Sequence, residues 1–220
     1  DWRPNFNGIG FLFRNEPAMP SARNSIRNIL TRAALHQHWW INDPDCLLIR
    51  PDTRLTLDEV RSLASVIALT GGSLLVSDDL PKLPPERLHI AEVLLPVIGE
   101  RARVLDWFDA EMPELLRLDR VDAVGERHLL AKFNWSDEPV EYDLVPSVFH
   151  LNPGKYWARE FWGGTIAEMS EDTPMRLSLP AHSCAVVTLQ AVQERDAAYV
   201  GSDLHISQGM EIVEWHADEK

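Results

Sequence analysis

Apolar residues in the first hundred positions follow two patterns, a helical period and short continuous runs. Between residues 21 and 38 they recur three and four positions apart, which predicts a helix with one apolar face. A second helix is predicted to begin at Thr56, because Thr56 and Glu59 form an S/T-x-x-E capping box ahead of another apolar stripe. A third helix is expected between residues 84 and 98, where two prolines open the pattern and a glycine follows it.

Short apolar runs separate these helices. Residues 39–49 and 73–77 each form a run typical of a strand that is buried on both faces of a parallel sheet. The resulting order of helix, strand, helix, strand and helix predicts an α/β arrangement for residues 1–100. Because a helix that connects parallel strands makes a right-handed crossover, we expect Asp45 and Asp78 to lie on the same side of the sheet.

The pattern changes after about residue 100. Short alternating segments replace the helical periods, at the spacing expected of an antiparallel β-sandwich. These segments are residues 103–108, 128–135, 140–144, 156–161, 175–179 and 184–192. In the tail, residues 205–207 and 210–215 flank a Gln-Gly turn and predict a terminal hairpin. We therefore expect an all-β domain over residues 101–220.

Charge and cysteine content narrow the class of function. The 220 residues include 21 Lys and Arg against 34 Asp and Glu, a net charge of −13, and such a field repels nucleic-acid phosphates and anionic membranes. A neutral ligand suits this field better. Cys46 and Cys184 have no partner at metal or disulfide-framework spacing. We therefore expect free thiols, no metal, and a reducing, cytoplasmic location.

Four aspartates follow the predicted strands: Asp43, Asp45, Asp78 and Asp79. In (β/α) barrels substrate sites are built at the carboxyl ends of the strands, so these side chains are candidates for one site. The alternative is that they cap helices or fix turns, as aspartate commonly does. Retaining glycosidases use two carboxylates about 5 to 5.5 Å apart, and sequence spacing does not identify such a pair.

The tryptophan content, 8 residues in all, is a second candidate feature. Tryptophan faces stack on sugar rings through the same apolar contacts that make them good core residues. Trp39 and Trp40 point to opposite sides if they lie on one strand. One of them can then reach the interior or mouth of the barrel while the other packs outward, and core packing is the default interpretation for both.

The run from Trp39 to Arg50, WWINDPDCLLIR, resembles the segment around the seventh strand of the α-galactosidases of glycoside hydrolase family thirty-six and the related melibiases. Residues 55–61, 71–73 and 77–80 follow in the order that this family shows. The resemblance is strongest over residues 20–100. It implies the C-terminal part of a (β/α)8 TIM barrel, followed by an antiparallel β-sandwich, from a retaining enzyme that cleaves terminal α-galactosides.

The resemblance also implies a division of roles within the site. Asp45, Cys46 and Trp40 would line the sugar pocket, and Asp43, Asp78 and Asp79 would organise its rim by hydrogen bonds. Cys46 stands where related enzymes have Met. The reaction of this family needs two carboxylates and water, so no cofactor and no metal are implied.

The resemblance places the catalytic nucleophile upstream of Asp1. Asp1 itself is a candidate for the acid/base, or residues 2–4 lie a few positions past that group, and we favour the second interpretation. The implied partners are an α-galactoside or related oligosaccharide and the N-terminal remainder of the barrel, with self-association left open. The 220-residue chain alone is therefore expected to be inactive.

Two other hypotheses remain open at the level of sequence. In the first, the β-domain is a non-catalytic carbohydrate-binding or structural module, which exposed aromatic residues on one sandwich face would favour. In the second, the enzyme class is the same and the sugar differs, since relatives act on other α-linked residues.

Overall fold

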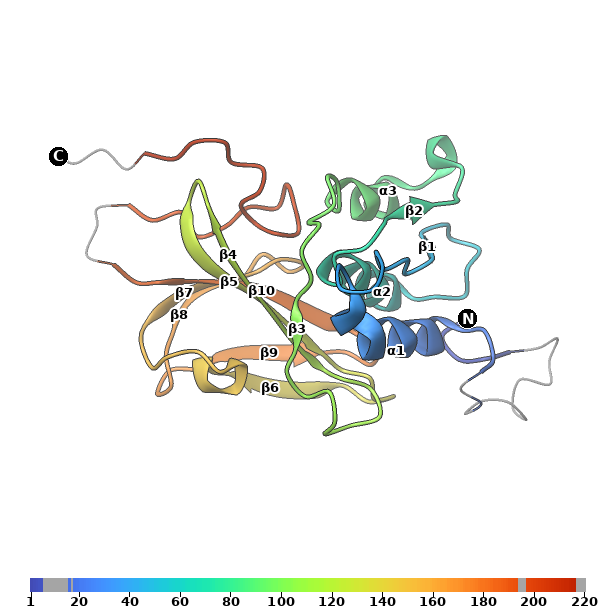
Figure 1. Cartoon of the computed structure of the whole chain (residues 1–220), viewed down its shortest axis with the longest axis horizontal. Coiled ribbons are helices and arrows are strands. Elements are labelled where there is room, and N and C mark those ends of the chain that lie inside the picture. Colours follow the sequence, from blue (N-terminus) through green and yellow to red (C-terminus); the bar gives the residue numbers. More distant parts are fainter. Residues whose placement is uncertain (6–15, 17, 194–196, 217–220) are drawn as a thin grey trace. The chain divides into compact units, whose positions relative to one another are not determined.

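The computed structural model describes residues 1–5, 16, 18–193 and 197–216 (Figure 1). The chain divides into two compact units, Asp1–Pro113 and Glu114–Lys220. The sequence pattern places the change of texture near residue 100, and the structural division falls after Pro113.

The first unit contains three α-helices, three short strands and two 3₁₀ turns among the described residues. They are α1 (Ala22–Arg32), η2 (Ala33–Leu35), β1 (Cys46–Leu47), α2 (Leu57–Leu69), β2 (Leu75–Val76), η3 (Leu80–Lys82), α3 (Pro85–Glu92) and β3 (Arg103–Val104). Helices α1 and α2 lie side by side (Figure 1). Their apolar faces and the strands form a core with fully buried Ile26, Leu30, Leu47, Ile49 and Leu69.

Helix α2 begins at the capping box that the sequence predicts. The Thr56 hydroxyl accepts a hydrogen bond from the Glu59 backbone N–H (3.2 Å), and the Glu59 carboxylate accepts one from the Thr56 N–H (2.8 Å). After the helix, Gly72 passes directly against the Asn42 carbonyl, where a Cβ atom would collide. This close approach lets Ser73 N–H donate to Asn42 O (3.0 Å) and brings β2 beside β1.

Strands β1 and β2 are parallel neighbours, as predicted, with Cys46 paired to Leu75. The expectation that Asp45 and Asp78 share one side of the sheet is wrong, because Asp45 precedes β1 and Asp78 follows β2. The cause is local. Asp45 has a left-handed backbone (φ 67°), so the strand starts only after it, and residues 39–41 of the predicted strand lie before the turn.

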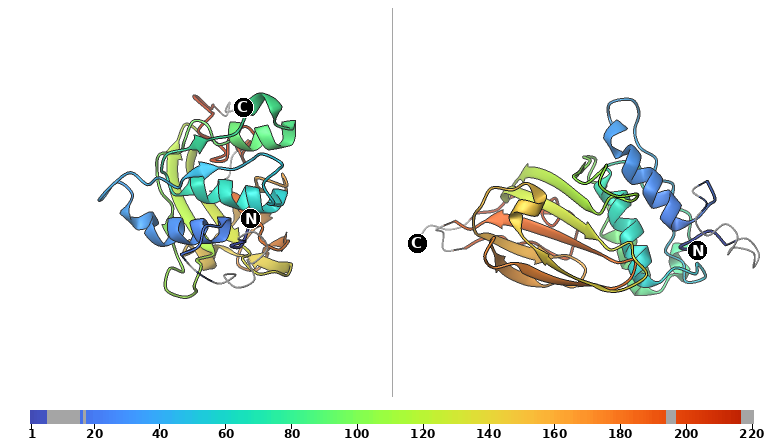
Figure 2. Two further views of the ribbon diagram at one scale, coloured as in Figure 1. Left: turned by 90° about the vertical axis from the view of Figure 1, so that its right-hand side faces the viewer. Right: turned by 90° about the horizontal axis from the view of Figure 1, so that it is seen from below.

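The second unit is an antiparallel β-sandwich, which confirms the predicted fold of this part. Its strands are β4 (Leu115–Asp122), β5 (Gly125–Phe133), β6 (Val140–Leu144), β7 (Tyr156–Glu160), β8 (Ile166–Met169), β9 (Met175–Leu179) and β10 (Cys184–Ala191), with η4 (Pro146–Phe149) after β6. The larger sheet has the order β4-β5-β10-β7-β8, and β6 pairs with β9 in a second layer (Figure 2).

Alternating burial along the strands explains the two layers. In β9, Met175, Leu177 and Leu179 are buried while the residues between them are exposed, the period-two pattern of a sheet with one wet face. Phe133 of β5 is fully buried and stacks on Trp135 with ring centroids 4.6 Å apart. The sandwich therefore has an apolar core of its own.

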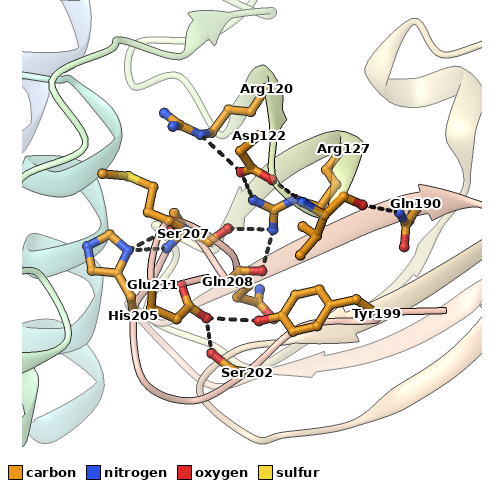
Figure 3. Close-up of polar contacts among 12 residues, drawn as sticks. Arg120, Asp122, Arg127, Gln190, Tyr199, Ser202, His205, Ser207, Gln208 and Glu211 are labelled. Carbon is orange, nitrogen blue, oxygen red and sulfur yellow. Dashed lines mark hydrogen bonds and ion pairs between the residues drawn. The ribbon is translucent and has the colours of Figure 1, made fainter. Parts of the chain in front are cut away.

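The segment after β10 does not form the predicted terminal hairpin. Over the described residues 197–216 the backbone makes turns and bends and contains no strand. Figure 3 shows the buried Arg127 guanidinium donating to the carbonyl oxygens of Ser207 (3.2 Å) and Gln208. Backbone groups that would pair in a hairpin are instead satisfied by a side chain of β5.

A second arginine fastens the same segment. Arg159 of β7 donates to the Ser202 carbonyl (2.6 Å) and to Gln208 Oε1 (2.9 Å). The Glu211 carboxylate accepts hydrogen bonds from the hydroxyls of Tyr199 (2.9 Å) and Ser202 (Figure 3). Burial raises the pKa of Tyr199 to about 12, so this hydroxyl is a neutral donor at physiological pH.

Candidate functional site

The first unit contains a cavity of about 600 Å³ beside α1 and β1. Three of the residues predicted from sequence lie in its wall: Asp1, Asp45 and Cys46. Its volume is within the range of roughly 300–1,000 Å³ that is typical of small-molecule sites. The rest of the lining combines polar groups of helix α1 and of residues 50–54 with apolar residues such as Met19, Leu48 and Leu63.

A second hollow, of about 390 Å³, adjoins the first and contains three predicted residues, Trp40, Asp43 and Asp45. Ser25, Asn28 and Asp45 border both spaces. Asp45 therefore lies where the two hollows meet. Neither lining includes Asp78 or Asp79, so the structure brings five of the seven predicted residues to these hollows.

Asp43 and Asp45 shape the turn that leads into β1. Asp43 Oδ1 accepts a hydrogen bond from the Asp45 N–H (3.0 Å), and Asp45 Oδ1 accepts one from the Cys46 N–H (2.8 Å). Aspartate tolerates the left-handed conformation of Asp45 better than most residues because its short side chain bonds the local backbone. The exposed Asp45 carboxylate keeps its second oxygen available to a ligand.

Cys46 opens β1 and is half-buried. Its Sγ accepts a hydrogen bond from the Ser77 hydroxyl (2.8 Å), which fixes the thiol beside the end of β2. Neither Cys46 nor Cys184 takes part in a disulfide. Ser77 therefore acts as a positioning group for a side chain in the cavity wall.

Asp78 has a structural position instead of a place in the wall. Its side chain is fully buried and accepts hydrogen bonds from the backbone N–H groups of Ile49 (2.7 Å) and Arg50 (3.1 Å) and from Arg50 Nη1 (2.8 Å). The Asp78 hydrogen bond raises the pKa of Arg50. Asp79 lies on the surface, paired with Lys82 at 2.5 Å.

Trp39 and Trp40 are both exposed, by 77% and 47% of their surfaces. Their rings meet edge to face with centroids 6.1 Å apart, and Trp40 Nε1 donates to Asn42 Oδ1 (3.0 Å). Neither tryptophan is a core residue of the described chain, so the core-packing interpretation is wrong. Trp40 is the one that borders a hollow.

Asp1 lines the larger cavity and pairs with Arg54 at 3.7 Å. Arg50 and Arg54 are site residues that the sequence reasoning missed, as are Ser25 and Asn28 of α1. A signal for the helical pair was present, because Ser21, Ser25 and Asn28 recur at i, i+4 and i+7 and so form one polar stripe. The cavity thus offers both hydrogen-bond donors and acceptors.

Over residues 1–5, 16, 18–193 and 197–216, no three His, Cys, Asp or Glu side chains are grouped to hold a metal ion. No helix in the same part of the chain is long and apolar enough to cross a membrane.

Comparison with known proteins places this geometry in context. No family model matches the chain. An α-galactosidase of Saccharomyces cerevisiae matches with a TM-score of 0.63 and 14% identity, over 87% of this chain and 57% of its own. The fold of this chain is similar to part of that α-galactosidase.

Two further solved structures agree. α-Galactosidase I of Mortierella vinacea matches with a TM-score of 0.61 and 13% identity, over 78% of this chain and 45% of its own. A GH27 β-L-arabinopyranosidase of Geobacillus stearothermophilus matches with a TM-score of 0.53 and 13% identity, over 77% and 41%. The chain spans about half the length of these proteins, so the likeness covers a portion of their fold.

Proposed function

We propose that this chain is part of a retaining glycoside hydrolase, related to family thirty-six, that removes terminal α-galactosyl residues. The first unit would be the last portion of its (β/α)8 barrel. One observation supports this above the others. Asp45 and Cys46, which the sequence resemblance assigns to a sugar pocket, line a cavity in a chain whose fold matches α-galactosidases.

Each residue of the site has a proposed task. The second carboxylate oxygen of Asp45 would accept a sugar hydroxyl, and Cys46, held by Ser77, would pack against the ring. Trp40 would supply an aromatic face at the neighbouring hollow. Asp43 would shape the rim through its bond to the Asp45 N–H, and Asp78 would support the rim from behind by fixing the backbone of Ile49 and Arg50.

The chemistry would need a nucleophilic carboxylate from the preceding part of the barrel. In a retaining glycosidase that carboxylate forms a glycosyl-enzyme intermediate, and a second carboxyl group protonates the leaving oxygen and then activates water. Asp1 is the acid/base candidate within this chain, since it lines the cavity beside Arg54. The partner of the first unit would then be the remainder of the barrel.

The test compares the 220-residue chain with a longer chain that includes the preceding coding sequence, using a nitrophenyl α-galactoside. We expect turnover by the longer chain and none by the shorter one. In the longer chain, Asp45→Asn should lower kcat/KM roughly 10–150-fold, because a hydrogen bond to a charged group contributes about 1.5–3 kcal/mol.

Asp143→Asn is the matched control, because Asp143 is an exposed aspartate of β6 that pairs only loosely with Arg176, at 3.6 Å. It should leave kcat/KM unchanged. Unchanged activity of the Asp45→Asn variant would exclude the proposed role of Asp45. Turnover by the 220-residue chain at the rate of the longer one would refute the proposal that the nucleophile lies upstream.

The alternative of a carbohydrate-binding sandwich with an aromatic face is not supported. Among the described aromatic side chains of the second unit, only Trp215 is exposed, at 40%. A flat binding face needs several such rings in one plane.

A further inference from the structure

The second unit contains a small polar pocket, of about 290 Å³, at one end of strands β4, β5, β7 and β10. Arg117 of β4, His128 of β5 and Tyr156 of β7 form its floor. Antiparallel pairing creates this grouping, because Asp119 lies directly opposite His128, and Tyr156 lies opposite Ala191 of β10. The volume is just below the range of roughly 300–1,000 Å³ for small-molecule sites, which suits a single sugar ring.

Asp119 fixes the tautomer of His128. Its Oδ1 atom accepts hydrogen bonds from Arg117 Nε (2.7 Å) and from His128 Nδ1 (2.6 Å). Burial raises the pKa of Asp119, but the hydrogen bonds from Arg117 and His128 outweigh it, so the pKa lies below its ordinary value. An ionised carboxylate only accepts, so Nδ1 of His128 carries a proton, and Nε2 is the ring nitrogen that Asp119 leaves for a ligand.

The other floor residues are also held in place before any ligand arrives. Arg117 Nη1 donates to the carbonyl oxygens of Phe149 (2.9 Å) and His150 (2.7 Å), and the Tyr156 hydroxyl donates to Asn152 O (2.9 Å). The rings of His128 and Tyr156 meet edge to face, with centroids 6.3 Å apart. Fixed side chains lose little entropy when a ligand binds.

The charges around the pocket disfavour an anion. Arg117 is neutralised by its ion pair with Asp119, and Glu126 adds a further carboxylate to the wall. The lining also includes the imidazoles of His128 and His150, the amides of Asn152 and Gln193, and the aromatic ring of Tyr156. Mixed donors and acceptors beside an aromatic ring match a molecule with many hydroxyls and an apolar ring face.

We propose that this pocket is a binding site for a neutral hexose, with His128 Nε2 accepting a sugar hydroxyl. The site is independent of the cavity in the first unit and of the glycosidase activity proposed for it. It would give the sandwich a sugar-binding function of its own, through a pocket and not through an aromatic face.

The experiment follows the side-chain and amide NMR signals of His128 and Tyr156 while D-galactose or D-glucose is added to the labelled 220-residue chain. We expect saturable shifts of these signals with at least one of the two hexoses. His128→Gln should weaken binding about tenfold, because the flexible glutamine amide does not hold an acceptor in the position that Asp119 fixes for the imidazole ring. Absence of saturable shifts with both sugars overturns the proposal.

His182→Gln is the matched control. His182 is also a partly buried histidine of the second unit paired with an aspartate, Asp137, at 2.9 Å, and it is outside the pocket lining. This variant should bind the hexose with unchanged affinity. Equal affinities for His128→Gln and the unmodified chain, an equal loss with His182→Gln, or shifts caused by inorganic phosphate but by neither sugar would each refute a neutral-hexose site.

Discussion

Buried arginines fix the end of the second unit at the level of single residues. The Arg127 side chain is almost entirely inaccessible; its Nη2 is paired with Asp122, and its Nη1 donates to two backbone carbonyls. A buried charge is tolerated only when it is paired and hydrogen-bonded, because the loss of water is costly. Substitutions that displace the Arg127 side chain should therefore lower the free energy of unfolding strongly.

Gly209 gives the first such change. A Cβ atom at this position would overlap the Arg127 guanidinium, so Gly209→Ala should displace the arginine from its carbonyl partners. We expect a loss of about 1–3 kcal/mol in the free energy of unfolding, as for other overpacked sites. Gly154→Ala is the control, because a Cβ there makes only ordinary contact, at 3.6 Å, with Tyr156. Equal denaturation midpoints for both variants would contradict this account.

Tyr199 should titrate late. Its pKa is raised to about 12 from 10.0, chiefly by burial, so folding favours the neutral hydroxyl. The contribution to stability is complete below pH 10 and is lost as the pH rises towards about 12. Ultraviolet titration of tyrosinate should show a late component that Tyr199→Phe reduces, while the part from Tyr156, whose pKa burial also raises, stays. Ionisation of all tyrosines together near pH 10 in the folded chain would disprove the prediction.

Local signals decided which elements the sequence could predict. The capping box placed the start of α2, and strict alternation placed β6 and β9 at their observed residues. Strand β4 was missed because charged residues fill the alternate positions between its leucines, and β8 because it is a short strand at the sheet edge. The prediction of a terminal hairpin was wrong because the carbonyl groups of this segment bond the side chain of Arg127. That residue lies about 80 positions away, and no local pattern reveals the contact.

The candidate site was likewise only partly predictable from local sequence patterns. Sequence spacing grouped Asp45 with Asp78, yet a single left-handed residue moves Asp45 to the start of its strand. Asp78 is buried because the N–H groups of Ile49 and Arg50 need an acceptor, a demand visible only once β1 and β2 are paired. The sequence therefore predicted which aspartates lie near the strands, but not which of them line the cavity and which support the backbone behind it.

The capping box of α2 gives a prediction at the scale of one helix. Thr56→Ala removes the acceptor of the Glu59 N–H and should destabilise the first unit by about 0.5–2 kcal/mol. Thr56→Ser keeps the hydroxyl and should recover most of this loss. The measurement is the unfolding free energy in denaturant, and identical values for the Ala and Ser variants would contradict a capping role.

At the scale of the whole molecule, the two units have separate apolar cores. The second unit buries Leu116, Leu130, Phe133, Leu144 and Met169 almost completely. A unit with its own core is expected to fold alone. Residues 114–220 expressed separately should therefore unfold cooperatively and show dispersed NMR signals that match those of the complete chain. A spectrum without dispersion would show that this core is insufficient.

The fastening of the last segment by Arg127 and Arg159 also affects how that segment opens. Irregular surface segments usually exchange their amide hydrogens through small local fluctuations. Here the Gln208 N–H is bonded to His205 O (2.8 Å), and the Gln208 carbonyl and side chain are held by the two arginines. Releasing the segment would leave the buried guanidinium groups of Arg127 and Arg159 without these partners. The amide hydrogens of the segment should therefore exchange only when strands β5 and β7 open as well. The same opening should be needed before proteases cleave its peptide bonds.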